Sequence, residues 1–419
     1  MKKNFLKIAA ATALAAPAGV MAEAVLYGRL HSSIDYAEVK NAVGRVDPET
    51  RRLVDTDDFK GWGVAGHGTY MPGANRANRV GVKGSEELGY GLRGIYQFEL
   101  GFNLGASDDN IPGNTSAVTV RNTFVGLAGE FGTALVGRHD TPHNLSTGRL
   151  DLFSTTMADY GDTIGFDDIR ADNAIAYISP NFSGFQFMGA LVAPGGANAI
   201  DGRNINTDDL NSAYSLAGIY SNGPFYGSIA YEVVSNDMFM DTSTSRAGRS
   251  ACFTEVPGGL VPNQSCNYVR DDYSKWRIGL GLLDWNGFTL TAIYEQQDDL
   301  AAGQTWSELN DGSPVFDGTR KQSLWQVQAG YSFGNNMVKA MYGAVDRDSN
   351  IPRLWDDVSM NNLRNKFEGD RSAWAIAFDH NFSQRTKAYV LYTAVNDDQR
   401  NFERGSEWSG FSVGMQHNF

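Results

Sequence analysis

Few residues in this sequence have the types and spacing that covalent chemistry requires. His139 and His143 are four positions apart, which on a helix could bind a metal ion, but they flank Thr-Pro and so belong to a loop. Ser146 lies near His143, the pairing that a lipase needs, yet no nucleophile-elbow sequence surrounds it. These patterns favour a polar loop cluster, and a lipase-like enzyme stays only a rival hypothesis.

The two cysteines, Cys252 and Cys266, lie in a polar stretch with prolines and glycines, SACFTEVPGGLVPNQSCNY. In an exported protein this spacing predicts a disulfide that closes a loop, and two unrelated free thiols are the alternative. A zinc site is not expected, because no companion His or Cys lies nearby. We therefore expect neither a metal nor a cofactor.

The first residues predict export. Three lysines and a short apolar run precede Val20-Met21-Ala22, which offers small residues where a signal peptidase cuts. We interpret residues 1–22 as a signal peptide cleaved after Ala22 and residues 23–419 as one domain, since the apolar run is too short to span a membrane. Removal takes three lysines and no acid, so the net charge of −13 becomes −16. This acidity argues against a nucleic-acid partner.

Apolar and polar residues alternate through much of the domain. In RGIYQFELGF one side carries Tyr96, Phe98, Leu100 and Phe102, and in KWRIGLGLL Lys275 and Arg277 oppose Trp276, Ile278, Leu280 and Leu282. A period of two predicts strands. Alternation alone would also fit a soluble β-sandwich, which buries such faces against each other.

The order of turns and loops separates these two folds. Seven tight turns lie at 85–91, 128–132, 181–185, 221–225, 284–288, 332–336 and 381–385. They alternate with eight long polar segments at about 37–75, 104–118, 140–171, 195–210, 237–271, 298–320, 347–370 and 397–407. Seven hairpins and the two terminal runs give sixteen strands. We predict an all-β fold: a 16-stranded antiparallel transmembrane barrel with short periplasmic turns, long external loops and an aqueous channel.

The sequence resembles the general porins of Gram-negative bacteria across residues 23–419. AVLYGRLHSSIDY is similar to the first strand of that family, RVGVKGSEELGYGLRGIYQFE to the second hairpin, RNTFVGLAGEFGTALVGRHDTPH to strands four and five, and DIRADNAIAYISPNFSGFQF to strands six and seven. The resemblance implies a homotrimer in outer-membrane lipid that passes ions and small hydrophilic solutes passively. It also implies a third loop, about 140–171, folded inward.

The same resemblance assigns individual residues. Phe419 matches the signal read by the barrel-assembly machinery, which periplasmic chaperones would supply with the chain. By strand parity Arg79 and Lys83 share the inward face. Four arginines resemble the basic wall of the constriction: Arg79, Arg121, Arg138 and Arg170. Asn122, on the presumed outer face, would suit a neighbouring subunit better than lipid.

The third loop supplies the opposite charge. Asp151, Asp159 and Asp162 are the candidates for the narrowest point, and Asp167 and Asp168 follow in the same loop. Carboxylates that face arginines across a low-dielectric waist would create a transverse field that favours small polar solutes. Solvated loop charge is the alternative.

Two other kinds of barrel stay open as hypotheses. A substrate-specific sugar or phosphate channel would carry an aromatic or lysine ladder, which Phe153, Tyr160 and Phe166 could begin. A non-conducting structural barrel would need the third loop to plug the lumen, although its length suits a constriction better. Acidic outer loops would attract cations at the mouth while the arginines oppose them, so we predict weak cation preference.

Overall fold

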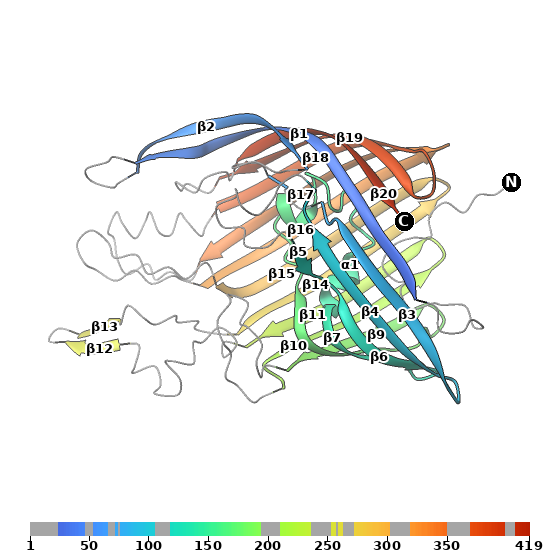
Figure 1. Cartoon of the computed structure of the whole chain (residues 1–419). Helices are drawn as coiled ribbons and strands as arrows, with labels where there is room; N and C mark the ends of the chain where they lie inside the picture. The colour runs from blue at the N-terminus through green and yellow to red at the C-terminus, as the bar shows by residue number, and fades with distance from the viewer. Residues whose placement is uncertain are drawn as a thin grey trace.

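The computed structural model describes residues 24–46, 53–65, 72–73, 76–104, 118–193, 210–235, 253–256, 259–262, 272–301, 319–349, 369–398 and 407–419. Their main feature is a closed barrel of antiparallel strands, drawn in Figure 1. Within these residues no helix has both the length and the apolar character needed to cross a membrane.

The barrel sheet contains eighteen strands: β1 (Val25–Val46), β2 (Leu53–Val64), β3 (Arg79–Gly89), β4 (Leu92–Phe102), β5 (Val118–Val120), β6 (Thr123–Gly129), β7 (Gly132–Asp140), β8 (Arg170–Ile178), β9 (Phe185–Val192), β10 (Ala213–Asn222), β11 (Phe225–Val234), β14 (Tyr273–Trp285), β15 (Phe288–Ala301), β16 (Thr319–Phe333), β17 (Asn336–Ser349), β18 (Gly369–Asn381), β19 (Thr386–Asp397) and β20 (Trp408–Asn418). A separate two-stranded sheet contains β12 (Phe253–Val256) and β13 (Gly259–Pro262).

Sixteen strand positions close the barrel, as the sequence predicts. β2 and β3 occupy one position, since both pair with β1, and β5 and β6 occupy another, since both pair with β4. Closure comes from β1 and β20, which pair from Arg29 with Asn418 to Val39 with Trp408. A closed sheet leaves no open edge of backbone groups in lipid.

The prediction of one long loop over 37–75 is wrong. β1 continues to Val46 and β2 occupies Leu53–Val64, so a tall hairpin stands where polar composition suggested a loop. Between β2 and β3 the chain turns into the barrel and buries Arg76, whose Nη2 lies 2.7 Å from Oδ2 of the buried Asp35. Inward-facing polar side chains of this kind lower the apparent apolarity of a strand.

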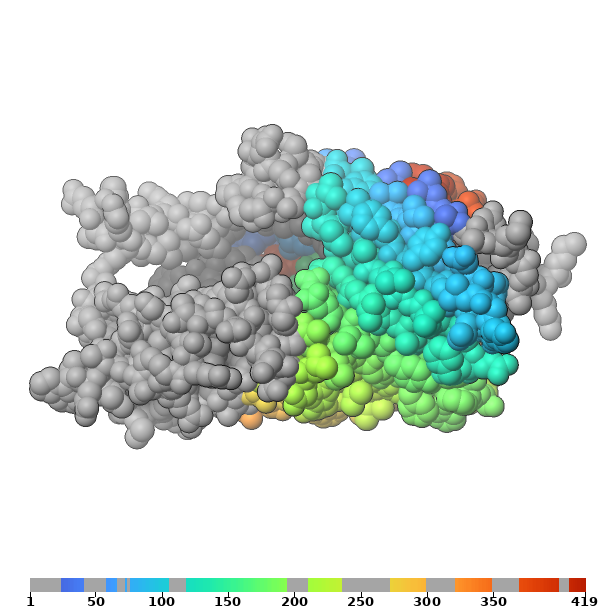
Figure 2. Space-filling model, turned by 60° about the horizontal axis from the view of Figure 1, so that its bottom comes forward, coloured from blue at the N-terminus to red at the C-terminus, as the bar shows by residue number. Residues whose placement is uncertain are grey.

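The outer face of the barrel carries the apolar half of each alternating strand. Figure 2 shows this face over the first half of the chain. An aromatic girdle runs round the upper end of this face from β10 through β20 to β2, near the long loops, and contains Tyr214, Tyr231, Trp276, Tyr294, Trp325, Tyr342, Trp374, Tyr392, Phe411, Tyr36 and Trp62. Aromatic rings at this level are typical of a membrane interface.

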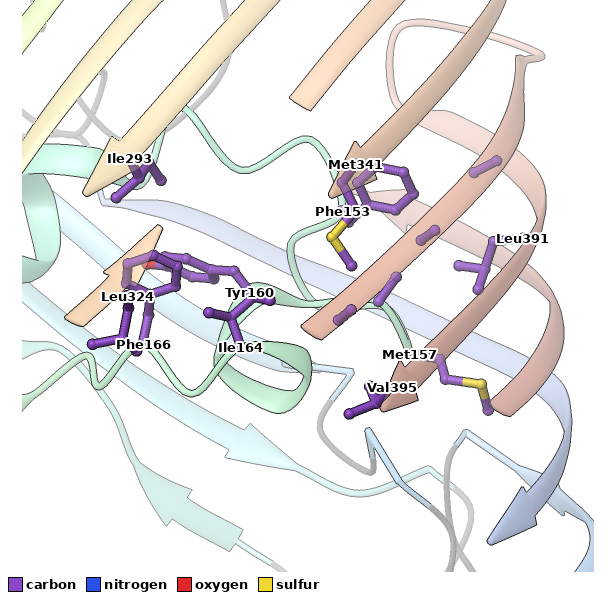
Figure 3. Packing of buried hydrophobic residues seen from close by; sticks show 14 of the residues in the cluster. Phe153, Met157, Tyr160, Ile164, Phe166, Ile293, Leu324, Met341, Leu391 and Val395 are labelled. Atoms are coloured by element: carbon purple, nitrogen blue, oxygen red, sulfur yellow. The ribbon is translucent and has the colours of Figure 1, made fainter. Parts of the chain in front are cut away.

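The third loop, residues 141–169 (L3), lies inside the barrel (Figure 1). It contains two short helices, α1 (Pro142–Thr147) and α2 (Tyr160–Thr163). Apolar side chains of L3 pack against inward-facing residues of the strands from β15 to β19, as Figure 3 shows; the labelled residues are Phe153, Met157, Tyr160, Ile164, Phe166, Ile293, Leu324, Met341, Leu391 and Val395. L3 is therefore a packed interior element rather than a free loop.

Candidate constriction inside the barrel

A cluster of arginines occupies the inner face of β1, β3 and the chain just before β6. Arg29 stands directly opposite Arg79 in the β1–β3 register. The Nε atoms of Arg79 and Arg121 lie 3.5 Å and 2.8 Å from the two carboxylate oxygens of Glu99, and the Tyr27 hydroxyl donates to the same carboxylate at 2.9 Å. One buried carboxylate thus serves two arginines.

Arg29 was absent from the predicted basic wall. Its Nε donates to Oδ1 of Asn418 at 3.1 Å, an amide that carries no neutralising charge. The signal was present in AVLYGRLHSSIDY, because Arg29 alternates with the outward Leu26 and Leu30. We therefore add Arg29 to the candidate site, together with Glu99.

Arg138 is placed apart from this cluster. It pairs in register with Thr123, on the face that carries the exposed Val125 and Val136. Its guanidinium forms an ion pair with Asp172, whose side chain is also exposed. The structure thus puts Arg138 on the outer face of the barrel.

Arg170 lies where L3 rejoins the wall, and it is already neutralised. Its Nη2 is 2.8 Å from Oδ1 of Asp140, and its Nε donates to Oδ1 of Asn122 at 2.7 Å. The Asn122 amide nitrogen in turn donates to Asp140 at 2.9 Å. Asn122 therefore has partners within its own chain and does not need a neighbouring subunit to satisfy it.

Asp151 is buried between L3 and the wall. Its Oδ1 accepts hydrogen bonds from the Phe153 backbone N–H at 3.0 Å and from Nε2 of Gln328 at 2.8 Å. Burial raises the pKa of this carboxyl to about 6. Asp151 fastens the loop to β16.

Asp159 acts inside the loop itself. It caps α2 by accepting from the Gly161 N–H at 2.9 Å, and its other oxygen accepts from the Thr155 N–H at 2.6 Å. Burial, and then the neighbouring charges of Asp151 and Asp162, raise the pKa of Asp159 well above its usual range. Of the three predicted acids, only Asp162 has an exposed side chain.

Asp167 and Asp168 face cationic residues of β14. Oδ1 of Asp168 lies 2.7 Å from Nη1 of Arg277, and Oδ2 of Asp167 lies 3.5 Å from Nζ of Lys275. Sequence reasoning missed Lys275 and Arg277 as loop partners, although their alternation in KWRIGLGLL had marked them as a polar face. These ion pairs neutralise two of the five loop acids.

The aromatic residues of L3 do not line a path. Phe153, Tyr160 and Phe166 all belong to the buried apolar cluster, with exposures of 0, 6 and 4%. A sugar slide needs ring faces open to the lumen, and these rings pack against the wall instead. This placement disfavours the substrate-specific sugar channel that they suggested.

The candidates for covalent chemistry have other roles in the structure. The Ser146 hydroxyl donates to the His143 carbonyl oxygen at 2.6 Å rather than to the imidazole. His143 is buried, with Nε2 3.3 Å from Glu295, and Nδ1 of His139 lies 2.8 Å from the Asp140 carbonyl oxygen. The described residues contain no group of three or more His, Cys, Asp or Glu arranged to hold a metal ion.

Three predicted positions concern the ends of the chain and an outer loop. Ala22 and the pair Cys252 and Cys266 lie outside the described residues. Phe419 exchanges backbone hydrogen bonds with Gly28 at 3.0 and 3.1 Å, and a Cβ at Gly28 would come within 2.4 Å of its ring. The ring therefore covers Gly28, next to the seam between β1 and β20.

Comparisons with known proteins agree with this architecture. A family model described as Gram-negative porin matches residues 9–400. An outer membrane porin protein of Bordetella pertussis is 28% identical over 55% of this chain and 59% of its own length, and a major outer membrane protein P.IB of Neisseria sicca is 22% identical over the whole of both chains. An anion-selective porin from Comamonas acidovorans shares the fold, with a TM-score of 0.60 at 19% identity over 95% of this chain and 100% of that one.

Proposed function

The chain belongs to the Gram-negative porin family, and from that premise we propose where its channel is narrowed and which ions it favours. It is an outer-membrane porin, a water-filled barrel for the passive passage of ions and small hydrophilic solutes. We place the narrowest part between L3 and a basic wall of Arg29, Arg79 and Arg121. The single observation that supports this most strongly is Arg29 opposite Arg79, with Glu99 as the only carboxylate bound to the wall among the described residues.

The charges at this level favour anions. Asp151 and Asp159 spend their lone pairs on hydrogen bonds within L3 or to the wall, and Asp167 and Asp168 are paired with β14. The basic wall keeps an excess of positive charge, because its three arginines share Glu99. A weakly screened positive charge in a narrow, low-dielectric channel raises the local concentration of anions. This proposal replaces the weak cation preference predicted from composition.

A salt-gradient measurement tests the proposal. We expect the reversal potential of the purified channel in a KCl gradient to lie on the anion side, and Arg79→Gln with Arg121→Gln to shift it toward zero or beyond. Arg93→Gln is the matched control, because Arg93 also lies on the inward side of β4 but pairs with Glu87 near a tight turn. Cation preference in the wild type, or equal shifts in both variants, would contradict the proposed basic wall.

Solute flux separates a general channel from a specific one. Because the aromatic side chains of L3 are buried, nothing among the described residues of the loop offers a stacked path for sugar rings. We expect sugar flux into proteoliposomes to rise linearly with sugar concentration. Saturation at low millimolar concentration would point to a binding site and to a substrate-specific channel.

The outer face of β6–β8 is the surface through which we propose that copies of the chain form a homotrimer. The aromatic girdle ends at Tyr214, which pairs with Leu191 of β9. Two strands further on, the ion pair of Arg138 and Asp172 takes that level. A charged pair is costly against lipid and less so against protein.

A further inference from the structure

We infer that Arg277 is a positioning residue that clasps the two ends of L3 together and thereby fixes the aperture of the channel. The inference rests on the proposed place of L3 at the constriction. Arg277 is fully buried on the inner face of β14. Its Nη1 donates to Oγ1 of Thr147 at 2.8 Å and to Oδ1 of Asp168 at 2.7 Å.

These two partners stand at opposite ends of the loop. Thr147 is the last residue of α1, where the chain enters the lumen, and Asp168 lies two residues before β8, where it leaves. One nitrogen therefore joins the descending and returning legs of L3. A planar guanidinium suits this task, because it presents several donors in a fixed geometry, whereas an ammonium is a single point charge.

Neighbouring residues hold the clasp in place. Glu295 of β15 forms an ion pair with Nε of Arg277, which orients the guanidinium toward the loop. Lys275 lies two residues earlier on the same face; its Nζ donates to the Asp167 carbonyl oxygen at 2.6 Å and lies 3.1 Å from Glu232. The returning leg is thus bound at two consecutive residues.

Glycines on the same face give the descending leg its room. A Cβ on Gly279 would stand 2.6 Å from Cδ1 of Leu150 and 2.8 Å from Cγ2 of Thr147, and a Cβ on Gly281 would stand 2.8 Å from Leu150. In KWRIGLGLL the inward positions therefore supply two cations and then two glycines. This strand is built to receive the neck of L3.

Variants of the loop partners test the clasp while leaving Arg277 and Glu295 bound to each other. Thr147→Val removes one hydroxyl with little change of shape, and Asp168→Asn removes the charge from the returning leg. In planar bilayers we expect several-fold higher open-channel current noise and a lower closing voltage for the double variant, with smaller changes of the same sign for Thr147→Val. Proteoliposome swelling should show that larger sugars enter.

Asp172→Asn is the matched control, because it removes another aspartate from an ion pair with arginine, four residues away and on the outer face. It should behave as the wild type. Arg277→Lys keeps the charge but lacks the fork, so we expect it to reproduce the double variant if the geometry of the clasp matters.

Resistance of the barrel to heat in detergent identifies the folded channels to which these readings apply. Wild-type noise, closing voltage and exclusion limit in folded Thr147→Val and Arg277→Lys channels would overturn the clasp. Failure of the proposed basic wall is a different result, since it appears in the reversal potential of Arg121→Gln.

Discussion

Asp151 makes the attachment of L3 sensitive to pH. Its pKa is raised to about 6 by burial, so the folded state binds the proton more tightly than the unfolded chain does. Stability should therefore rise as pH falls through 6 and level off near the ordinary aspartate pKa of about 4, by up to about 3 kcal/mol. Urea unfolding from pH 7.5 to 4.5 should show a steeper rise for the wild type than for Asp151→Asn. Parallel pH profiles would contradict this assignment.

Individual residues show what strand parity can and cannot predict. Parity alone places Arg79 inward, and it also places Arg138 beside Val136 on the outer face, where the structure has it. The resemblance to general porins assigned Arg138 to the constriction instead. Asp151 carries no comparable signal, because the burial of a loop carboxylate depends on Gln328, far away in the sequence.

Gly279 tests at the scale of one strand how closely L3 lies against the wall. An alanine Cβ would meet Leu150, Thr147 and Ser228 at 2.6 to 2.8 Å, so the loop must move toward the lumen. We expect Gly279→Ala to lower single-channel conductance and to cost about 1–3 kcal/mol of stability. Gly227→Ala is the control, because its Cβ would meet only Leu280, at 3.9 Å. Unchanged conductance in Gly279→Ala would mean that the wall, not the loop, gives way.

Strands and turns were predictable to different extents. Alternation and tight turns located the hairpins well, because each outward face must be apolar in lipid and each short turn needs particular residues. β2 escaped prediction because it contains Asp55, Asp57 and Asp58, which polar composition assigns to a loop. Above the membrane a strand has no need of an apolar face, so composition no longer distinguishes it.

The outer-face ion pair of Arg138 and Asp172 provides the test for the whole assembly. If this surface meets a neighbouring copy, Arg138→Glu leaves two adjacent acids at the interface, and we expect trimers to dissociate to folded monomers. Crosslinking and light scattering in mild detergent would measure this. Lys321→Glu is the control, since Lys321 pairs with Asp298 at 3.4 Å on a distant part of the outer face. Stable Arg138→Glu trimers, or equal dissociation in both variants, would count against the proposed surface.

The placement of L3 also has a consequence in time. L3 lies between β7 and β8 in the sequence, but the residues that hold it belong to β11 and to strands from β14 onward, such as Tyr226, Arg277 and Gln328. Contacts between distant parts of a chain form late. A newly inserted barrel therefore begins as a wide, unselective hole and matures into a narrow one. For the cell, the interval between those two events is a period of leakage, and strong loop contacts shorten it.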